Sequence, residues 1–164
     1  SGGGITDLSP LSGTTTMRGL SIDNHRVSDL TPLAGWTDLL TLSANGNRIS
    51  DIGPLAGKPG LYNVLMDWNV PGISDLSPLS AEPLYFLAVN ATAGAGRISD
   101  ISSLAGRTTL RFLSLANQPV SDTSPLGGQC WLRQVYMPGG AYTCPDPAFS
   151  SLSACGVSVT SSCP

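Results

Sequence analysis

Charged residues are scarce in this sequence of 164 residues. Asp, Glu, Lys and Arg together make up 12% of the chain, and the formal net charge is -3. So little charge excludes a chain that charge repulsion keeps disordered. We also expect no nucleic-acid partner, because such a partner calls for a basic patch. No apolar run approaches the roughly 18 residues that a membrane-spanning helix needs, so we expect no such segment in this fragment.

The residue patterns of common enzymes are missing as well. Histidine occurs once, at position 25, and no cysteine has a histidine partner in sequence. The chain contains neither a Gly-x-Ser-x-Gly nucleophile motif nor a Walker-type phosphate loop. We therefore expect a protein that is not an enzyme and that needs no cofactor or metal.

Cysteine is absent from the first 129 residues and then occurs four times, without Cys-x-x-Cys spacing, which argues against a zinc site. The even count and the Ser, Thr and Pro around the cysteines predict two disulfides and an extracellular location, in a secreted or cell-surface protein. The alternative is four buried thiols in a cytosolic protein. Four cysteines allow three connectivities, of which we favour Cys130–Cys144 with Cys155–Cys163.

One motif, [IV]-[ST]-D-x-x-P-L-[AS], recurs six times along the chain. The repeats begin at residues 5, 27, 49, 73, 98 and 120, and only Ser103 departs from the proline. These intervals of 22 to 25 residues lie inside the range of leucine-rich repeats, which is about 20–29 residues. Residues 1–4, Ser-Gly-Gly-Gly, precede the first repeat and are interpreted as a linker or a cloning remnant.

The second half of each repeat predicts a strand. Residues 39–47 match L-x-x-L-x-L-x-x-N, in which inward and outward residues alternate as a half-buried strand requires. Stacked repeats would form six parallel strands on a concave face, with short 3₁₀ turns on the convex side. The predicted inward pairs are Leu20/Ile22, Leu42/Ala44, Val64/Met66, Leu87/Val89, Leu113/Leu115 and Val135/Met137.

These repeats resemble the leucine-rich repeats of bacterial internalins and of SDS22-like phosphatase regulators. The resemblance implies an α/β leucine-rich-repeat solenoid over residues 5–141, followed by a cysteine-containing C-terminal cap, or the start of another module, over residues 142–164. The family asparagine is kept at Asn47 and Asn69, and its other positions hold His25, Thr92, Gln118 and Gly140. We expect a structural role for His25 at that position. The apolar residue that usually follows the Pro-Leu-Ala-Gly segment is kept at Trp36 and replaced at Thr14, Lys58, Arg107 and Gln129.

Six of the eleven acidic residues are the repeated aspartates. A row of carboxylates could bind calcium, which prefers oxygen ligands. Because a proline follows at a nearly constant offset, we favour the interpretation that each aspartate caps its own turn. These residues are Asp7, Asp29, Asp51, Asp75, Asp100 and Asp122.

The outward strand positions divide the sheet into a polar N-terminal half and an apolar C-terminal half. Exposed aromatic clusters usually mark interaction sites, so we predict a ligand surface in the C-terminal half; the alternative is that a neighbouring segment or another copy covers it. Two insertions, Val70-Pro71-Gly72 and residues 92–97, lengthen loops at one edge, which are often part of a binding face. The four predicted exposed residues are Leu65, Phe86, Phe112 and Tyr136, and Tyr62, Trp68 and Tyr85 lie close in register.

Three functions agree with these features. The first is an extracellular binding or adhesion module that recognises a protein, or alternatively a glycan, through the concave face and adjacent loops. The second is an intracellular SDS22-like scaffold that binds a phosphatase, and the third is a surface antigen that serves display. Asn90-Ala91-Thr92 is in addition a candidate N-glycosylation site at Asn90.

Overall fold

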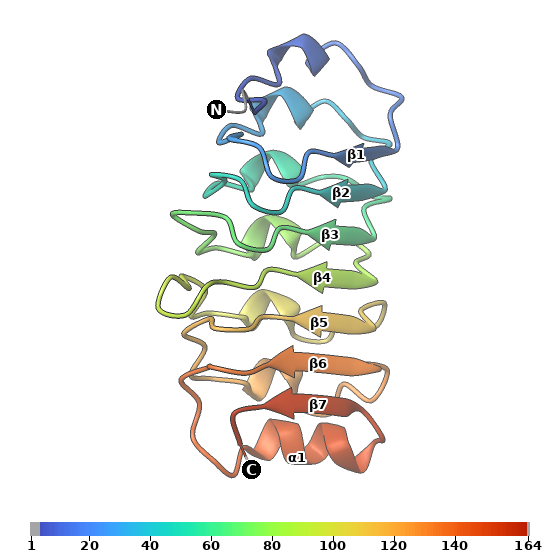
Figure 1. Cartoon of the computed structure of the whole chain (residues 1–164). Helices are drawn as coiled ribbons and strands as arrows, with labels where there is room; N and C mark the ends of the chain where they lie inside the picture. Colours follow the sequence, from blue (N-terminus) through green and yellow to red (C-terminus); the bar gives the residue numbers. More distant parts are fainter. Residues whose placement is uncertain (1–3, 164) are drawn as a thin grey trace.

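The computed structural model describes residues 4–163 and forms a single stack of parallel strands (Figure 1). The sheet has seven strands, one more than the sequence predicted, and their order in space is their order in sequence. Three of the four residues assigned to the linker, 1–3, lie outside the described part. The strands are β1 Gly19–Ser21, β2 Thr41–Ser43, β3 Asn63–Leu65, β4 Phe86–Ala88, β5 Phe112–Ser114, β6 Gln134–Met137 and β7 Ser158–Ser161.

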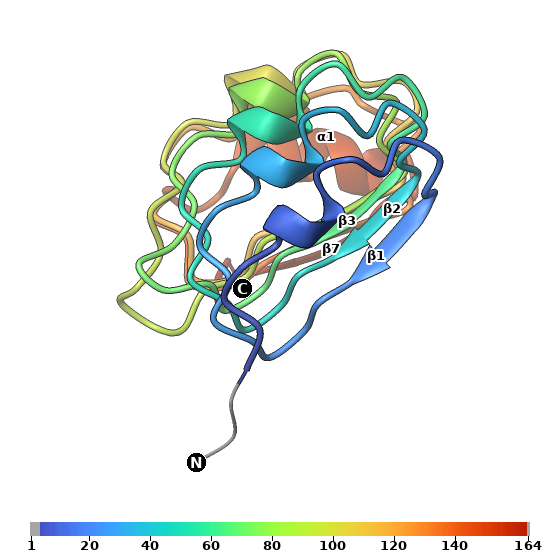
Figure 2. The ribbon, with the colours of Figure 1, turned by 90° about the horizontal axis from the view of Figure 1, so that it is seen from above.

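Short 3₁₀ helices lie on the opposite side of each turn, and the view along the stack superimposes them (Figure 2). In five of the six a proline occupies the first turn, where its missing N–H is not needed. Each spans only three residues because the chain turns back to the sheet at once. They are η1 Ser9–Leu11, η2 Thr31–Leu33, η3 Gly53–Leu55, η4 Ser77–Leu79, η5 Ser102–Leu104 and η6 Ser124–Leu126.

The repeated aspartates hold these turns in place. The Oδ1 atom of each accepts a hydrogen bond from the backbone N–H two residues later, at 2.7 to 2.9 Å. The side chain and the backbone N–H of Ser9 hold the pKa of Asp7 below its ordinary value, because both bonds favour the charged carboxylate. Each aspartate therefore bonds within its own turn, as the capping interpretation expected, but from the residue before the N-cap and not from the N-cap itself.

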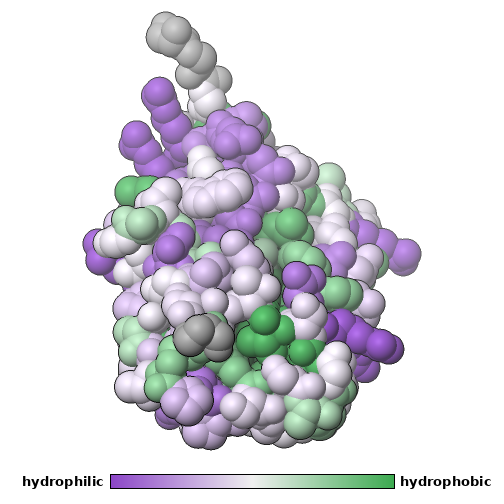
Figure 3. All heavy atoms as spheres, turned by 60° about the horizontal axis from the view of Figure 1, so that its bottom comes forward, coloured by the Kyte–Doolittle hydropathy of each residue, from purple (hydrophilic) through white to green (hydrophobic). Residues whose placement is uncertain are grey.

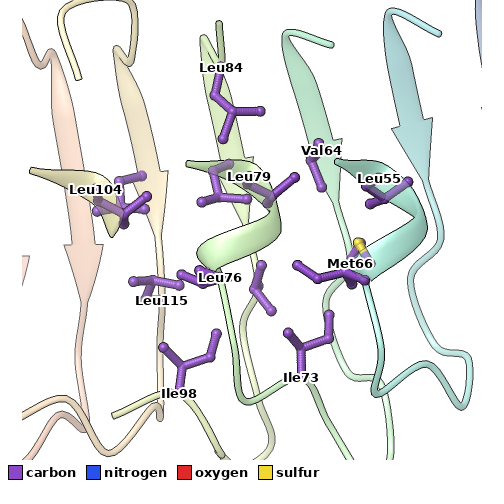
Figure 4. Close-up of a cluster of buried hydrophobic side chains, with 14 of the residues drawn as sticks. Leu55, Val64, Met66, Ile73, Leu76, Leu79, Leu84, Ile98, Leu104 and Leu115 are labelled. Carbon is purple, nitrogen blue, oxygen red and sulfur yellow. The ribbon is translucent and has the colours of Figure 1, made fainter. Parts of the chain in front are cut away.

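The core lies between the sheet and the 3₁₀ turns (Figure 4). Every predicted inward residue is buried except Leu20, which is half-buried at the N-terminal end of the stack. Each repeat adds a leucine from its 3₁₀ helix, such as Leu55, Leu79 and Leu104, which faces the strand residues of the same and neighbouring turns. Burying such a side chain contributes about 1.5–3 kcal/mol, so the repeated leucines account for much of the stability.

A column of mostly polar side chains also lies in the interior. Its members stand three residues after the leucine that ends each 3₁₀ helix. Lys58 has no exposed surface, and its Nζ donates to the carbonyl oxygens of Leu33, Ala34 and Trp36 in the preceding repeat. Trp36 and Gln129 likewise donate to the carbonyls of Leu11 and Leu104. These donors satisfy carbonyls at the ends of the 3₁₀ helices, which explains how the polar residues replace the usual apolar one.

Glu82 partly offsets the two positive charges of this column, those of Lys58 and Arg107. The carboxylate of Glu82 accepts a hydrogen bond from the N–H of Gly57 at 2.7 Å and is buried one repeat from Lys58 and one from Arg107. Burial lowers the pKa of Lys58, and the negative charge of Glu82 opposes that shift. Arg107 donates to the carbonyl oxygens of Ser103, Leu79 and Glu82.

The side chains at the family asparagine position connect successive repeats. In Asn69 the amide oxygen accepts from the N–H of Ile49 at 2.9 Å, and the nitrogen donates to the carbonyls of Ala44 and Met66. Gln118 makes the equivalent pair of contacts, since it accepts from Ile98 and donates to Val89. The longer glutamine therefore reproduces the asparagine bridge in a repeat that follows the four-residue insertion.

The segment after residue 141 forms a seventh turn of the stack. The helix α1, Pro147–Ala154, takes the place of a 3₁₀ turn, packs against η6 and β7, and buries Phe149 and Leu152. Asp146 caps this helix by accepting from the N–H of Phe149 at 3.1 Å. β7 then pairs with β6 in parallel, which adds the seventh strand.

The two disulfides join Cys130 to Cys155 and Cys144 to Cys163, so the pairing favoured from the sequence is wrong. The partners are 25 and 19 residues apart, which is close to one repeat length. Residues one repeat apart stack on neighbouring turns, and the Cα atoms are accordingly 5.2 and 5.5 Å apart. Both bridges therefore fasten the seventh turn to the sixth.

No helix in the described range, residues 4–163, has the length and apolar character needed to cross a bilayer.

Candidate binding surface

The register of the sheet aligns the outward side chains into straight columns. Phe86 of β4 pairs with Phe112 of β5, and Asn63 of β3 pairs with Phe86. The first outward column is Gly19, Thr41, Asn63, Phe86, Phe112 and Gln134, and the second is Ser21, Ser43, Leu65, Ala88, Ser114 and Tyr136. Both columns are those that the repeat alignment predicted.

Five aromatic residues gather over β3 to β6, and we call them the aromatic surface: Tyr62, Tyr85, Phe86, Phe112 and Tyr136. The rings of Phe86 and Phe112 are stacked with centroids 6.0 Å apart, and the ring of Tyr85 lies 5.6 Å from that of Phe112. Aromatic pairs at such distances attract one another beyond the effect of area burial. Three of the five rings, those of Tyr85, Phe86 and Phe112, therefore contact one another in a row.

Exposure differs among the residues of this surface. Tyr62, Tyr85 and Tyr136 are 39%, 47% and 40% exposed, whereas Phe86 and Phe112 are half-buried because neighbouring rings cover them. Leu65, in the second column, is also half-buried. The sequence predicted substantial exposure for Leu65, Phe86, Phe112 and Tyr136, and the structure gives it only to Tyr136.

Two hollows border the aromatic surface. One lies on the sheet face, between Phe86, Phe112, Gln134 and Tyr136. The other lies at the edge where the strands begin, and its walls are Tyr62, Pro83, Tyr85, Thr109 and Arg111. Tyr85 lines the edge hollow and Phe112 lines the hollow on the sheet face, so this pair of rings lies between the two hollows.

Trp68 does not belong to this cluster. It follows β3, whereas Tyr62 precedes β3, so the two residues lie at opposite ends of the strand. Trp68 is 54% exposed, has a positive φ of 56°, and shares its edge with Val70, which is 58% exposed. Both insertions are on this edge, and the loop after β4 projects farthest there (Figure 1).

The N-terminal half of the same face is polar and bonds to itself. Asp23 accepts two contacts from the hydroxyl of Ser43, at 2.8 and 2.9 Å, and one from the N–H of Asn45 at 2.8 Å. Burial raises the pKa of Asp23, but these hydrogen bonds outweigh that effect and leave the pKa below its ordinary value. Ser43 in turn accepts from the amide nitrogen of Asn45.

Asn90, the candidate glycosylation site, takes part in the same kind of ladder. Its side-chain oxygen accepts hydrogen bonds from the Ser114 hydroxyl at 2.8 Å and from the Ala116 N–H at 2.6 Å. Asn90 is half-buried and Thr92 is exposed. Glycosylation of Asn90 stays a prediction, and these contacts disfavour it because the amide is held against β5.

A third hollow lies at the C-terminal end, beside the Cys144–Cys163 disulfide, with Phe149 and Val159 in its walls. Figure 3 brings this end forward and shows strongly hydrophobic colour there, among paler and more polar residues. His25, at the other end of the stack, is half-buried.

The sequence interpretation missed Arg111 and Arg133 as surface residues beside the rings. Both stand immediately before a strand, where the alternation of inward and outward residues has not yet begun. Reading that single position through the repeats would have found them: Arg18, Leu40, Tyr62, Tyr85, Arg111 and Arg133.

No protein-family model matches this chain, and a search of curated proteins gives no match. Among solved structures, an internalin C2 from Listeria monocytogenes is similar with a TM-score of 0.83 and 27% identity, over 96% of this chain and 67% of that one. An internalin (inlF) from the same organism has a TM-score of 0.68 and 27% identity, over 95% of this chain and 50% of that one. This chain thus spans about two thirds of the first and half of the second.

The chain is a leucine-rich repeat protein. Its repeats are similar to those of the internalins, as the sequence motif indicated.

Proposed function

We propose that the chain is an extracellular binding or adhesion module, part of a larger secreted or cell-surface protein, that recognises a protein partner through the outer face of its sheet. The observation that carries the proposal is the aromatic surface over β3 to β6, with three exposed tyrosines around two half-buried phenylalanines. Tyrosine is enriched at binding hot spots, and monomers rarely expose large apolar clusters without a function.

The disulfides support the extracellular assignment. All four cysteines are paired, and disulfides persist in oxidising compartments and are rare in the cytosol. This pairing disfavours an intracellular SDS22-like scaffold.

A pair of double variants tests the proposal. The first carries Phe86→Ala with Phe112→Ala, and the control carries Ser21→Ala with Thr41→Ala, in the polar half of the same face. Each immobilised chain is offered extracellular material, and the affinity of the captured partner is then measured for both. We expect the aromatic variant to weaken binding by more than about 2 kcal/mol, roughly 30-fold, and the control to leave it unchanged.

Equal affinity for both variants would overturn the proposal. It would favour a surface antigen whose repeats serve display and have no single ligand. A partner that proves to be a glycan would keep the site and change the class of ligand.

A further inference from the structure

The edge hollow beside the aromatic surface has a second hollow next to it. The first contains Tyr62, Pro83, Tyr85 and Arg111, and the second contains Arg111, Trp131 and Arg133, next to the Cys130–Cys155 disulfide. Both are lined by Arg111, so they lie next to each other along the edge where the strands begin, one on either side of that residue. We call this pair of hollows the edge groove, and its residues are Tyr62, Pro83, Tyr85, Arg111, Trp131 and Arg133.

The edge groove changes chemistry along its length. Successive backbones at its floor are hydrogen-bonded, since Arg111 N–H donates to Tyr85 at 2.9 Å and Arg133 N–H donates to Arg111 at 2.8 Å. Neighbouring strands lie about 4.8 Å apart, so two tyrosines are followed at that spacing by two arginines. The groove is therefore aromatic over β3 and β4 and cationic over β5 and β6.

Arg111 is held in position by its own main chain. Its Nη1 donates to the carbonyl oxygens of Thr108 at 2.7 Å and Leu110 at 3.2 Å, which leaves Nη2 and Nε without a hydrogen-bond partner in residues 4–163. Arg133 is exposed beside it. In a chain of net charge -3, these two cations have no carboxylate bonded to them within the described range.

The dimensions and charge select an occupant. From β3 to β6 the groove extends over three strand intervals, about 14 Å, which is the length of about four residues of extended chain. Guanidinium groups bind carboxylates through paired hydrogen bonds, and grooves lined by aromatic residues receive extended, proline-containing segments. An extended peptide of about four residues fits this length.

We propose that the edge groove binds an extended acidic segment of a protein, with carboxylates at Arg111 and Arg133 and an apolar or proline residue against Tyr62 and Tyr85. This inference rests on the proposed protein-binding function and gives the chemistry of the partner. It extends the contact from the sheet face to the edge at which the strands begin.

Fluorescein-labelled peptides serve as probes. Two orders of sequence are used, because the segment could lie in the groove in either direction. One peptide has a run of four glutamates followed by a run of four prolines, and a second has the two runs in the reverse order. A third peptide, with glutamines in place of the glutamates, is the uncharged probe. Each is titrated with the intact chain, and anisotropy is recorded at low and physiological salt. We expect one acidic peptide to bind at least tenfold more tightly than the glutamine peptide, with affinity that falls as salt rises.

Matched variants locate the site. Arg133→Gln, at an exposed side chain, and Arg111→Gln with Arg133→Gln should weaken the acidic peptide at least fivefold, and Tyr85→Ala should weaken it as well. The control is Arg26→Gln with Arg48→Gln, which removes the same charge from exposed residues at the opposite edge and should change affinity less than twofold. Thermal unfolding of each variant verifies that it is folded.

Three results would overturn the inference: no binding of either acidic peptide, equal loss in the control pair, or binding of a heparin oligosaccharide that the arginine variants abolish while neither peptide binds. The last result would assign the groove to an anionic glycan. If the phenylalanine variants lose the captured partner while Arg133→Gln does not, the proposed function stands and only this inference fails.

Discussion

The two halves of the sheet face are built on the same backbone and differ in what their outward side chains do. In the N-terminal half, Asp23, Ser43 and Asn45 satisfy one another across β1 and β2. In the C-terminal half, Phe86 and Phe112 stack and offer carbon surface that no polar group satisfies. A polar surface whose groups already hydrogen-bond to one another gains little free energy from binding a partner, whereas an apolar surface gains free energy when the partner removes it from water.

The two ends of the stack also differ, in the bonds that hold the terminal turn in place. The N-terminal turn is held by hydrogen bonds such as that from Arg26 N–H to the carbonyl of Ile5 at 2.9 Å. The C-terminal turn has two disulfides as well as strand pairing. The half that carries the aromatic surface and the edge groove is thus also the half that is covalently reinforced.

Removing one bridge should have a large effect on the C-terminal half. Cys130→Ser with Cys155→Ser leaves Cys144–Cys163 in place and should lower the free energy of unfolding by about 2–4 kcal/mol, because the open loop gains conformational freedom in the unfolded chain. Urea denaturation measures the loss. Hydrogen exchange should show the amides of β6 and β7 losing protection before those of β2 and β3, and uniform loss along the sheet would contradict this difference between the halves.

Much of the fold could be predicted from the sequence because the repeat occurs six times. One motif places the buried side chains Leu42, Val64 and Leu87 in register without any knowledge of long-range contacts. The seventh turn lacks that motif, since α1 replaces the 3₁₀ turn, so β7 was missed. The spacing of Cys130 and Cys155, one repeat apart, was the available signal for both the extra turn and the disulfide pairing.

The candidate site was only partly predictable. Alternation gives the outward positions of Phe86 and Phe112, but their exposure depends on how neighbouring rings cover them. Arg111 lies outside the alternation, and its setting depends on the carbonyls of Thr108 and Leu110. Columns that continue regular strands are therefore predictable, and so is the position before each strand, whereas the hollows beside Arg111 are visible only in the structure.

Truncating the half-buried rings should have an intermediate effect on stability. Phe112→Ala should cost about 1 kcal/mol, more than the roughly 0.5 kcal/mol of a fully exposed site and less than the 3–5 kcal/mol of a buried phenylalanine. Leu113→Ala, the adjacent inward residue, provides the matched comparison and should cost about 2–5 kcal/mol. Both are measured by chemical denaturation, and a similar cost for the two would mean that Phe112 belongs to the core.

The smallest effect should come from the polar half, through Asp23. Its hydrogen bonds from Ser43 and Asn45 favour the carboxylate, so the pKa in the folded chain lies below the ordinary value of 3.8. A lowered carboxyl pKa contributes stability above pH 3.8, and that contribution is lost as the pH falls through the folded-state pKa. Asp23→Asn keeps the acceptor oxygen and removes the charge, so it should cost about 0.5–1 kcal/mol at pH 6.

Comparing the wild type with Asp23→Asn at two pH values isolates the contribution of Asp23, because the repeated aspartates are present in both proteins. The difference between wild type and Asp23→Asn, from urea midpoints at pH 6 and at pH 2.5, should shrink toward zero in acid. A difference that stays constant with pH would show that the charge of Asp23 does not stabilise the polar half. In that case the contrast between the two halves would lie in hydrogen-bond geometry and apolar area alone.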